Sequence, residues 1–113
     1  MAGSTQMQDF TLTLSGSAQP LSDAFQNKLA GGPDDSPLQW LSVQPDAANS
    51  GIIYFGASLA VSSSLYGFRM EVPVSSIPSA PFLWEPAQSR IRASDIFLKG
   101  TANDKLHILM VAY

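Results

Sequence analysis

The sequence predicts an all-β protein, a single antiparallel β-sandwich with one short helix at most. Six segments carry apolar residues either at every second position or in short unbroken runs. Clusters of Gly, Pro, Asn, Asp and Ser separate these segments roughly every 8 to 14 residues, as in sandwiches and barrels. A length of 113 residues fits one domain with its own core.

The first strand is expected over residues 7–15, after a small and polar stretch, residues 1–6, that we expect to form a flexible arm. Phe10, Leu12 and Leu14 fall on one face of this strand, and hydroxyl side chains fall on the other. Such alternation predicts one buried face and one wet face. The remaining residues, 7–113, are expected to form the single sandwich domain.

One short helix is expected between Ser22 and Gly31. Ser22 is a suitable N-cap, Phe25 and Leu29 share a helical face, and Gly31 is a suitable C-terminal stop. The composition of the residues that follow, as far as Pro37, predicts a loop.

The next two strands are expected at residues 38–44 and 52–56. Trp40 is in phase with Leu38, which predicts a place for it in the core. The segment 52–56 is apolar on both faces, which predicts a central strand. We expect the two strands to pair as a hairpin through the Asn49-Ser50-Gly51 turn.

Residues 59–64 mix small polar and apolar side chains, which predicts a short strand or a loop. Residues 67–74 predict a strand whose outer face carries Arg69 and Glu71. Two prolines exclude residues 74–81 from an interior strand, and a short apolar run follows at Phe82–Trp84.

The closing segment predicts a second β-hairpin. Apolar residues 96–98 precede a turn in which Gly100 and Asn103 can take positive φ. The second arm, residues 106–113, is apolar on both faces, so we expect a central strand or one covered on both sides. An exposed apolar edge invites pairing, so this terminus is expected either to enter the core or to meet another subunit.

Composition excludes several classes of function. Charged residues make up only 13% of the chain against 45% hydrophobic residues, which suggests that part of the surface is buried against partners. The net charge is −3 and the six basic residues are scattered, which argues against nucleic-acid binding. Without cysteine there are no disulfides or thiolate metal sites. We expect neither a signal peptide nor a membrane span.

Four motifs together resemble small virion proteins of tailed bacteriophages. They are Asn49-Ser50-Gly51, Ile53-Tyr54-Phe55-Gly56, the segment Val61–Gly67 (VSSSLYG) and the segment Ile96–Leu109 (IFLKGTANDKLHIL). The resemblance runs from about Val43 to the end of the chain, and residues 17–37 have no counterpart in it. It implies a β-sandwich, with a jelly-roll as one form, that decorates or cements the phage head. It also implies the major capsid protein as a partner and the capsid surface as the location, after assembly in the host cytoplasm. It transfers no catalytic residue.

The candidate chemical groups do not form a constellation in the sequence. His107 is the only histidine, and the nearest carboxylate by spacing is Asp104. A structural or interface role is therefore the better interpretation of His107. The serines at 62–64 lack a nucleophile elbow, so we interpret them as loop. Asp34 and Asp35, with other turn aspartates, lack the spacing of a calcium loop, although a hard cation stays a minor alternative.

Five residues are the interface candidates. Trp84 lies between prolines on a short segment and could be an exposed anchor. Arg90 and Arg92 share one side of an expected strand and could face acidic groups of a neighbouring chain, or be two solvated charges. Val111 and Tyr113 belong to the terminus that we expect to reach across a subunit boundary.

These observations favour a non-enzymatic structural virion protein that forms homo-oligomers and needs no cofactor. The alternative is a carbohydrate- or receptor-binding sandwich at a virion or cell surface, which would display an aromatic platform. An enzyme is disfavoured because the sequence offers no paired acid and base, metal cluster or phosphate loop.

Overall fold

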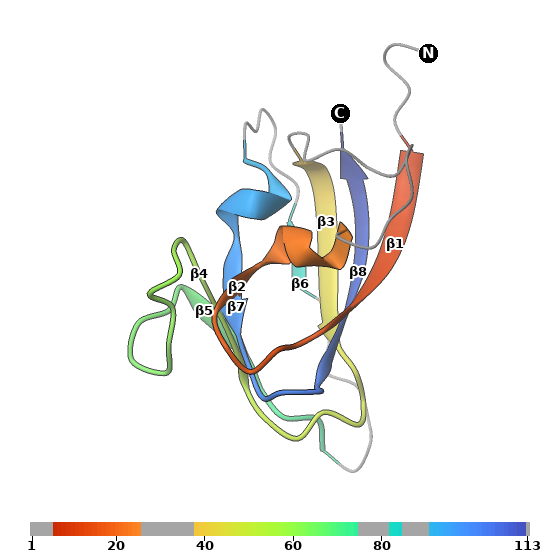
Figure 1. Cartoon of the computed structure of the whole chain (residues 1–113). Coiled ribbons are helices and arrows are strands. Elements are labelled where there is room, and N and C mark those ends of the chain that lie inside the picture. Colours follow the sequence, from red (N-terminus) through yellow and green to blue (C-terminus); the bar gives the residue numbers. More distant parts are fainter. Residues whose placement is uncertain (1–5, 26–37, 75–81, 85–90, 113) are drawn as a thin grey trace.

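The computed structural model describes residues 6–25, 38–74, 82–84 and 91–112. Two antiparallel sheets of four strands face each other across a hydrophobic core, with strand orders β1-β8-β3-β6 (sheet A) and β2-β7-β4-β5 (sheet B) (Figure 1). The strands are β1 (Gln6–Thr13), β2 (Gln19–Pro20), β3 (Leu38–Pro45), β4 (Ile53–Gly56), β5 (Phe68–Met70), β6 (Phe82–Trp84), β7 (Phe97–Lys99) and β8 (Lys105–Ala112). The described residues also contain two short 3₁₀ helices, η1 (Leu21–Phe25) and η2 (Ala93–Asp95). The predicted all-β sandwich is confirmed.

The strand pairing is that of a jelly-roll. Strand β1 pairs with β8, β2 with β7, β3 with β6 and β4 with β5, as when one long antiparallel ribbon is rolled up. The pairs β3–β8 and β4–β7 join the ribbon's turns within each sheet. The last strand, β8, is therefore central in sheet A, as its doubly apolar pattern predicts.

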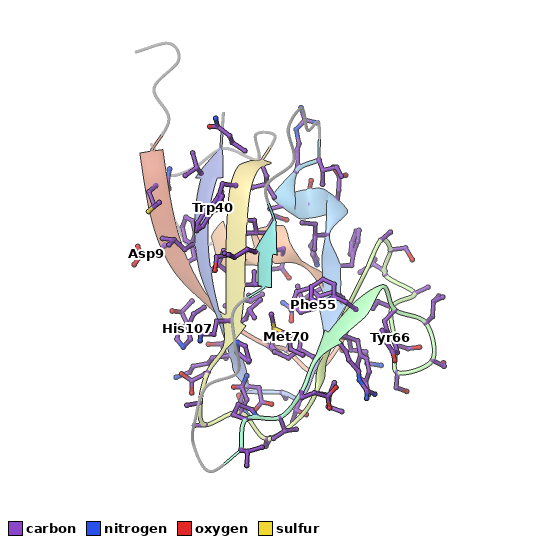
Figure 2. The ribbon with its side chains drawn as sticks, turned by 180° about the vertical axis from the view of Figure 1, so that it is seen from behind. Asp9, Trp40, Phe55, Tyr66, Met70 and His107 are labelled. Atoms are coloured by element: carbon purple, nitrogen blue, oxygen red, sulfur yellow. The ribbon has the colours of Figure 1, made fainter. Side chains whose placement is uncertain are left out.

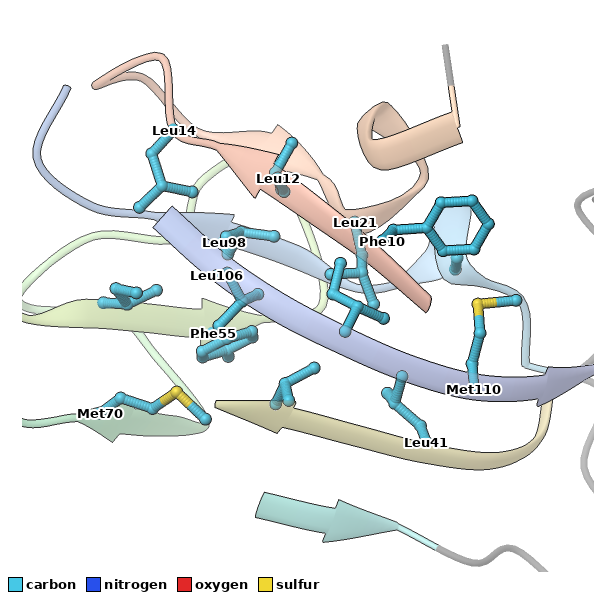
Figure 3. Close-up of a cluster of buried hydrophobic side chains, with 14 of the residues drawn as sticks. Phe10, Leu12, Leu14, Leu21, Leu41, Phe55, Met70, Leu98, Leu106 and Met110 are labelled. Atoms are coloured by element: carbon cyan, nitrogen blue, oxygen red, sulfur yellow. The ribbon is translucent and has the colours of Figure 1, made fainter. Parts of the chain in front are cut away.

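The core fills the space between the sheets (Figure 3). The predicted alternation of the first strand is confirmed, because Phe10, Leu12 and Leu14 are buried while the odd-numbered neighbours are exposed. On β8 the even-numbered positions face inward in the same way. The largest fully buried side chains are Leu21, Leu38, Val43, Pro45, Ile53, Leu98, Leu106 and Met110.

The predicted closing hairpin is wrong, because β7 and β8 lie in different sheets. Strand β7 pairs with β2 and β4, whereas β8 pairs with β1 and β3. Residues 100–104 therefore form an arch between the sheets. Asn103 has the expected positive φ of 74°, but Gly100 does not. Turn residues specify that the chain reverses and leave open which strands then pair.

The predicted hairpin between the segments 38–44 and 52–56 is wrong for the same reason. Strand β3 belongs to sheet A and β4 to sheet B, and residues 46–52 connect them across one end of the sandwich. Strand β4 is nevertheless central, between β7 and β5, as its two apolar faces predict.

Trp40 is not in the core, contrary to the prediction from its phase with Leu38. The β3–β8 register shifts between these two residues, which marks a β-bulge. An extra residue in one strand moves every later side chain to the opposite face. Leu38, Leu41 and Val43 are therefore buried, whereas Trp40 is half-buried on the outer face of sheet A.

The remaining elements differ from prediction mainly in length. The helix is of the 3₁₀ type and begins at Leu21, and the expected part beyond Phe25 lies outside the described residues. Strand β5 covers only three residues of the expected 67–74. Residues 59–64 are loop with one isolated bridge, Ser62 to Leu65. No helix within the described ranges is long and apolar enough to cross a membrane.

Candidate functional site

The outer face of sheet A carries an apolar patch at the end where the chain enters β1 and leaves β8. The strand registers place Met7, Val111 and Trp40 side by side in one row. Leu109, Ser42 and Leu83 form the next row. We call the apolar members the outer-face patch: Met7, Trp40, Leu83, Leu109 and Val111. Figure 2 shows Trp40 on this face, which is turned away from the core residues Phe55 and Met70.

The patch is accessible to a partner. Met7 and Leu83 are 62% and 55% exposed, and the other three members are half-buried. Among the described side chains of sheet A, the charged one beside the patch is Asp9, which pairs with Leu109 across the β1–β8 ladder. Side chains toward the other end of this face are polar, since Thr11, His107 and Gln44 share a row. The outer face is thus divided into an apolar half and a polar half.

His107 has a carboxylate partner, but it is Asp46 and not Asp104. The His107 Nε2 atom lies 2.8 Å from Asp46 Oδ1, and Nδ1 lies 3.3 Å from Thr11 Oγ1. The hydrogen bond from His107, followed by that from the Ala48 N–H, lowers the pKa of Asp46 below its ordinary value of 3.8.

Thr11, His107 and Asp46 have the residue types of a hydrolytic triad, yet their setting does not favour catalysis. The cluster lies on the open face of a sheet, and both Thr11 and His107 are exposed. Nucleophilic activation of a hydroxyl needs a site from which water is excluded and in which a developing charge is stabilised. The hydrogen bonds of His107 join β1 and β8 to the end of β3.

A second polar cluster ties together the two loops that contain resemblance motifs. The buried Asp104 carboxylate accepts hydrogen bonds from the Ser50 N–H at 3.0 Å and the Gly51 N–H at 2.9 Å, and from the Ser50 hydroxyl. The Asn49 amide donates to the Lys105 carbonyl at 2.7 Å and accepts from the Lys105 N–H at 2.8 Å. The Asn-Ser-Gly and Asp-Lys motifs are therefore partners in one structural contact.

The aspartates considered for a cation do not converge in the part of the chain that the structure describes. Asp104 is occupied by N–H donors and Asp46 by His107. Asp34 and Asp35 lie outside the described residues. Across the described ranges, no three His, Asp or Glu side chains come together as a metal-binding group.

An open cavity of about 860 Å³ lies between the sheets on the side of β4, β5 and η2. Leu41, Val43, Phe55 and Phe68 belong to its predominantly apolar lining, and loop residues such as Tyr66 complete it. Tyr66 is 41% exposed, and its ring centroid lies 5.1 Å from that of Tyr54. This pair of aromatic rings at the surface is a second candidate contact site.

Of the five predicted interface residues, Arg92 and Val111 have described side chains. Val111 belongs to the outer-face patch. The backbone of Trp84 lies in the edge strand β6 opposite Leu41, and its side chain is not among those described. Arg92 is exposed but is the N-cap of η2 and not part of a strand, which corrects the expected pairing of two arginines on one strand. Arg90 and Tyr113 lie outside the described residues.

The other members of the outer-face patch are not among the predicted interface residues, although the pattern of β8 indicates part of the patch. Leu109 and Val111 give β8 its second apolar face, and both are half-buried in the single chain. Trp40 could be assigned to this face only after the bulge in β3 was known.

No family model matches this chain, and neither a curated protein nor a solved structure matches it.

Proposed function

We propose that this chain is a non-enzymatic structural protein of a phage virion, which decorates or cements the capsid through self-association and contacts with the major capsid protein. The observation that carries the proposal is the outer-face patch on a sheet whose opposite face already packs on the core. The sequence resemblance to small virion proteins supplies the virion context.

Covering the outer-face patch would remove apolar surface from water. Full burial of one large aliphatic side chain contributes about 1.5–3 kcal/mol, so covering the exposed parts of Met7 and Leu83 would contribute about 1 kcal/mol each. Half-buried Trp40 adds a large aromatic surface, the type of side chain that dominates interface energetics. The scarcity of charged residues in the chain agrees with a surface that meets partners.

The virion location can be tested by mass spectrometry of gradient-purified particles of the phage that encodes this chain. We expect the chain in a constant ratio to the major capsid protein, and retained through repeated gradients. Particles that never contain the chain, although it is detected in the infected cell, would contradict the proposal.

The role of the patch can be tested with two leucines of similar exposure. Leu83, 55% exposed, lies in the patch, whereas Leu59, 61% exposed, lies in the loop after β4. We expect Leu83→Ser to weaken co-sedimentation with capsids that lack the chain about fivefold, since it removes about 1 kcal/mol of apolar burial. Leu59→Ser is the matched control and should bind as the wild type does. Equal binding by both variants would exclude the patch as the docking surface.

A second candidate function is carbohydrate or receptor binding, which the ring pair of exposed Tyr66 and half-buried Tyr54 favours. Aromatic rings at a surface can stack on a sugar ring. This function predicts weak binding on a glycan array and its loss in Tyr66→Ala, with no change in Leu83→Ser. An array without hits would count against it.

A further inference from the structure

Strand β1 is the one long free edge in the described part of the fold. The four edge strands of the two sheets are β1, β6, β2 and β5. Three of them have only two or three residues, whereas β1 has eight. Proteins usually protect exposed edges with short length, Pro, Lys or a bulge. The sequence of β1, QMQDFTLT, contains no Pro or Lys, and its ladder with β8 has no register shift.

The register shows which backbone groups of β1 are free for a new strand. Leu14, just beyond β1, donates its N–H to the Asp104 carbonyl at 2.8 Å and accepts from the Asn103 N–H at 3.0 Å. Hydrogen-bonded positions alternate along an antiparallel ladder, so the even-numbered residues of β1 direct their backbone groups toward β8. The N–H and C=O groups of the odd-numbered residues point away from the sheet.

We infer that β1 pairs with β1 of a second copy of this chain, antiparallel and about a two-fold axis. The two sheets A then form one continuous sheet of eight strands, with both outer-face patches on the same side. The role of this pairing in self-association rests on the proposed function. The geometry of the pairing rests on the edge strand alone.

Charge and the number of ladder pairs select the register of this pairing. Two-fold registers that use the outward-pointing groups place Asp9 opposite Met7, Asp9, Thr11 or Thr13 of the second copy. Like charges directly opposite each other are destabilising, which disfavours the Asp9–Asp9 register. The register centred on Phe10 pairs all four odd-numbered residues of β1, with Met7 opposite Thr13 and Asp9 opposite Thr11. A carboxylate and a hydroxyl are also compatible neighbours on the outer face.

The test uses Asp9→Pro with Asp9→Ala as its matched control. The Asp9 N–H points away from β8, so proline at this position leaves the β1–β8 ladder intact while it removes a donor and blocks the edge. By symmetry, two intermolecular hydrogen bonds are lost. We expect the wild type to be a dimer of 12.1 kDa chains by light scattering, and Asp9→Pro to raise the dimer dissociation constant at least tenfold. Asp9→Ala should remain dimeric.

Residue-resolved hydrogen exchange provides the second measurement. In the dimer the amides of Asp9 and Thr11 should be protected, and dilution to monomer should release them. The amides of Phe10 and Leu12 should stay protected in both states because β8 pairs with them.

Three results would overturn the inference. They are a wild type that stays monomeric up to about 1 mM, a dimer whose Asp9 and Thr11 amides exchange freely, and equal loss of the dimer in both Asp9 variants. Failure of the pairing is distinguishable from failure of the proposed function. A monomeric chain can still be found in purified virions, and a dimer can be absent from them.

Discussion

Replacing Asp104 with alanine should destabilise the fold far more than loss of a surface charge. Asp104 is 7% exposed, and its carboxylate accepts hydrogen bonds from two backbone N–H groups and one hydroxyl, all in the loop that joins β3 to β4. Hydrogen bonds to charged groups contribute about 1.5–3 kcal/mol each, and donors left unpaired add a penalty. Water can reach the partly buried donors and replaces some of these hydrogen bonds. We therefore expect the free energy of unfolding to fall by about 2–4 kcal/mol.

The assay is thermal unfolding followed by circular dichroism, with urea unfolding as a second measure. For a domain of this length, 1 kcal/mol corresponds to about 4 °C in Tm, so Asp104→Ala should lower the Tm by about 8–16 °C. Asp104→Asn keeps the shape and one acceptor oxygen and should cost about half as much. Asp9→Ala is the control, since Asp9 is exposed, and should change Tm by less than about 2 °C. An Asp104→Ala variant that unfolds with the control would refute the reasoning that this carboxylate fastens the two loops.

Three further predictions follow from other contacts. A Cβ at Gly51 would overlap the Thr101 hydroxyl, so Gly51→Ala should lower the free energy of unfolding by about 1–3 kcal/mol. Adding Thr101→Ala should recover most of this loss, as measured by a double-mutant cycle of Tm values. The pKa of Asp46 is lowered in the folded state, so the stabilising contribution of this carboxylate is complete above about pH 4 and is lost as the pH falls through that lowered pKa. In His107→Gln, NMR of the carboxyl groups should show a higher pKa for Asp46. An unchanged Asp46 titration would contradict the contact. Removing residues 111–113 takes ladder pairs from β1 and β3, the two neighbours of β8, so folding or assembly should be lost. A truncated chain with the Tm of the wild type and the same oligomeric mass in solution would contradict this.

The faces of the strands could be predicted from the sequence, because alternation is a local property. The burial of Phe10, Leu12 and Leu14 on β1 follows from alternation with a period of two, in which every second side chain faces the core. Trp40 could not be placed in this way, since one extra residue in β3 inverts the alternation without changing the composition.

Strand partners could not be predicted, because pairing depends on contacts between distant segments. The turn residues that predict both hairpins form crossings between the sheets. The contacts that fix these crossings, such as Asp104 with Gly51, join residues 53 positions apart. The same limit applies to the candidate site, since His107 meets Asp46 only because the end of β3 lies beside β8.

The central place of β8 in sheet A has a consequence for how the chain can fold during synthesis. Strands β1 and β3 are made first but do not pair with each other, and each is completed by the segment 105–112. Sheet A therefore cannot close on the ribosome until that segment has left the exit tunnel. Contacts between residues so far apart in the chain also make folding slow. In the interval β1 and β3 both lack their main partner, which is the period in which this protein is most exposed to aggregation and to capture by chaperones.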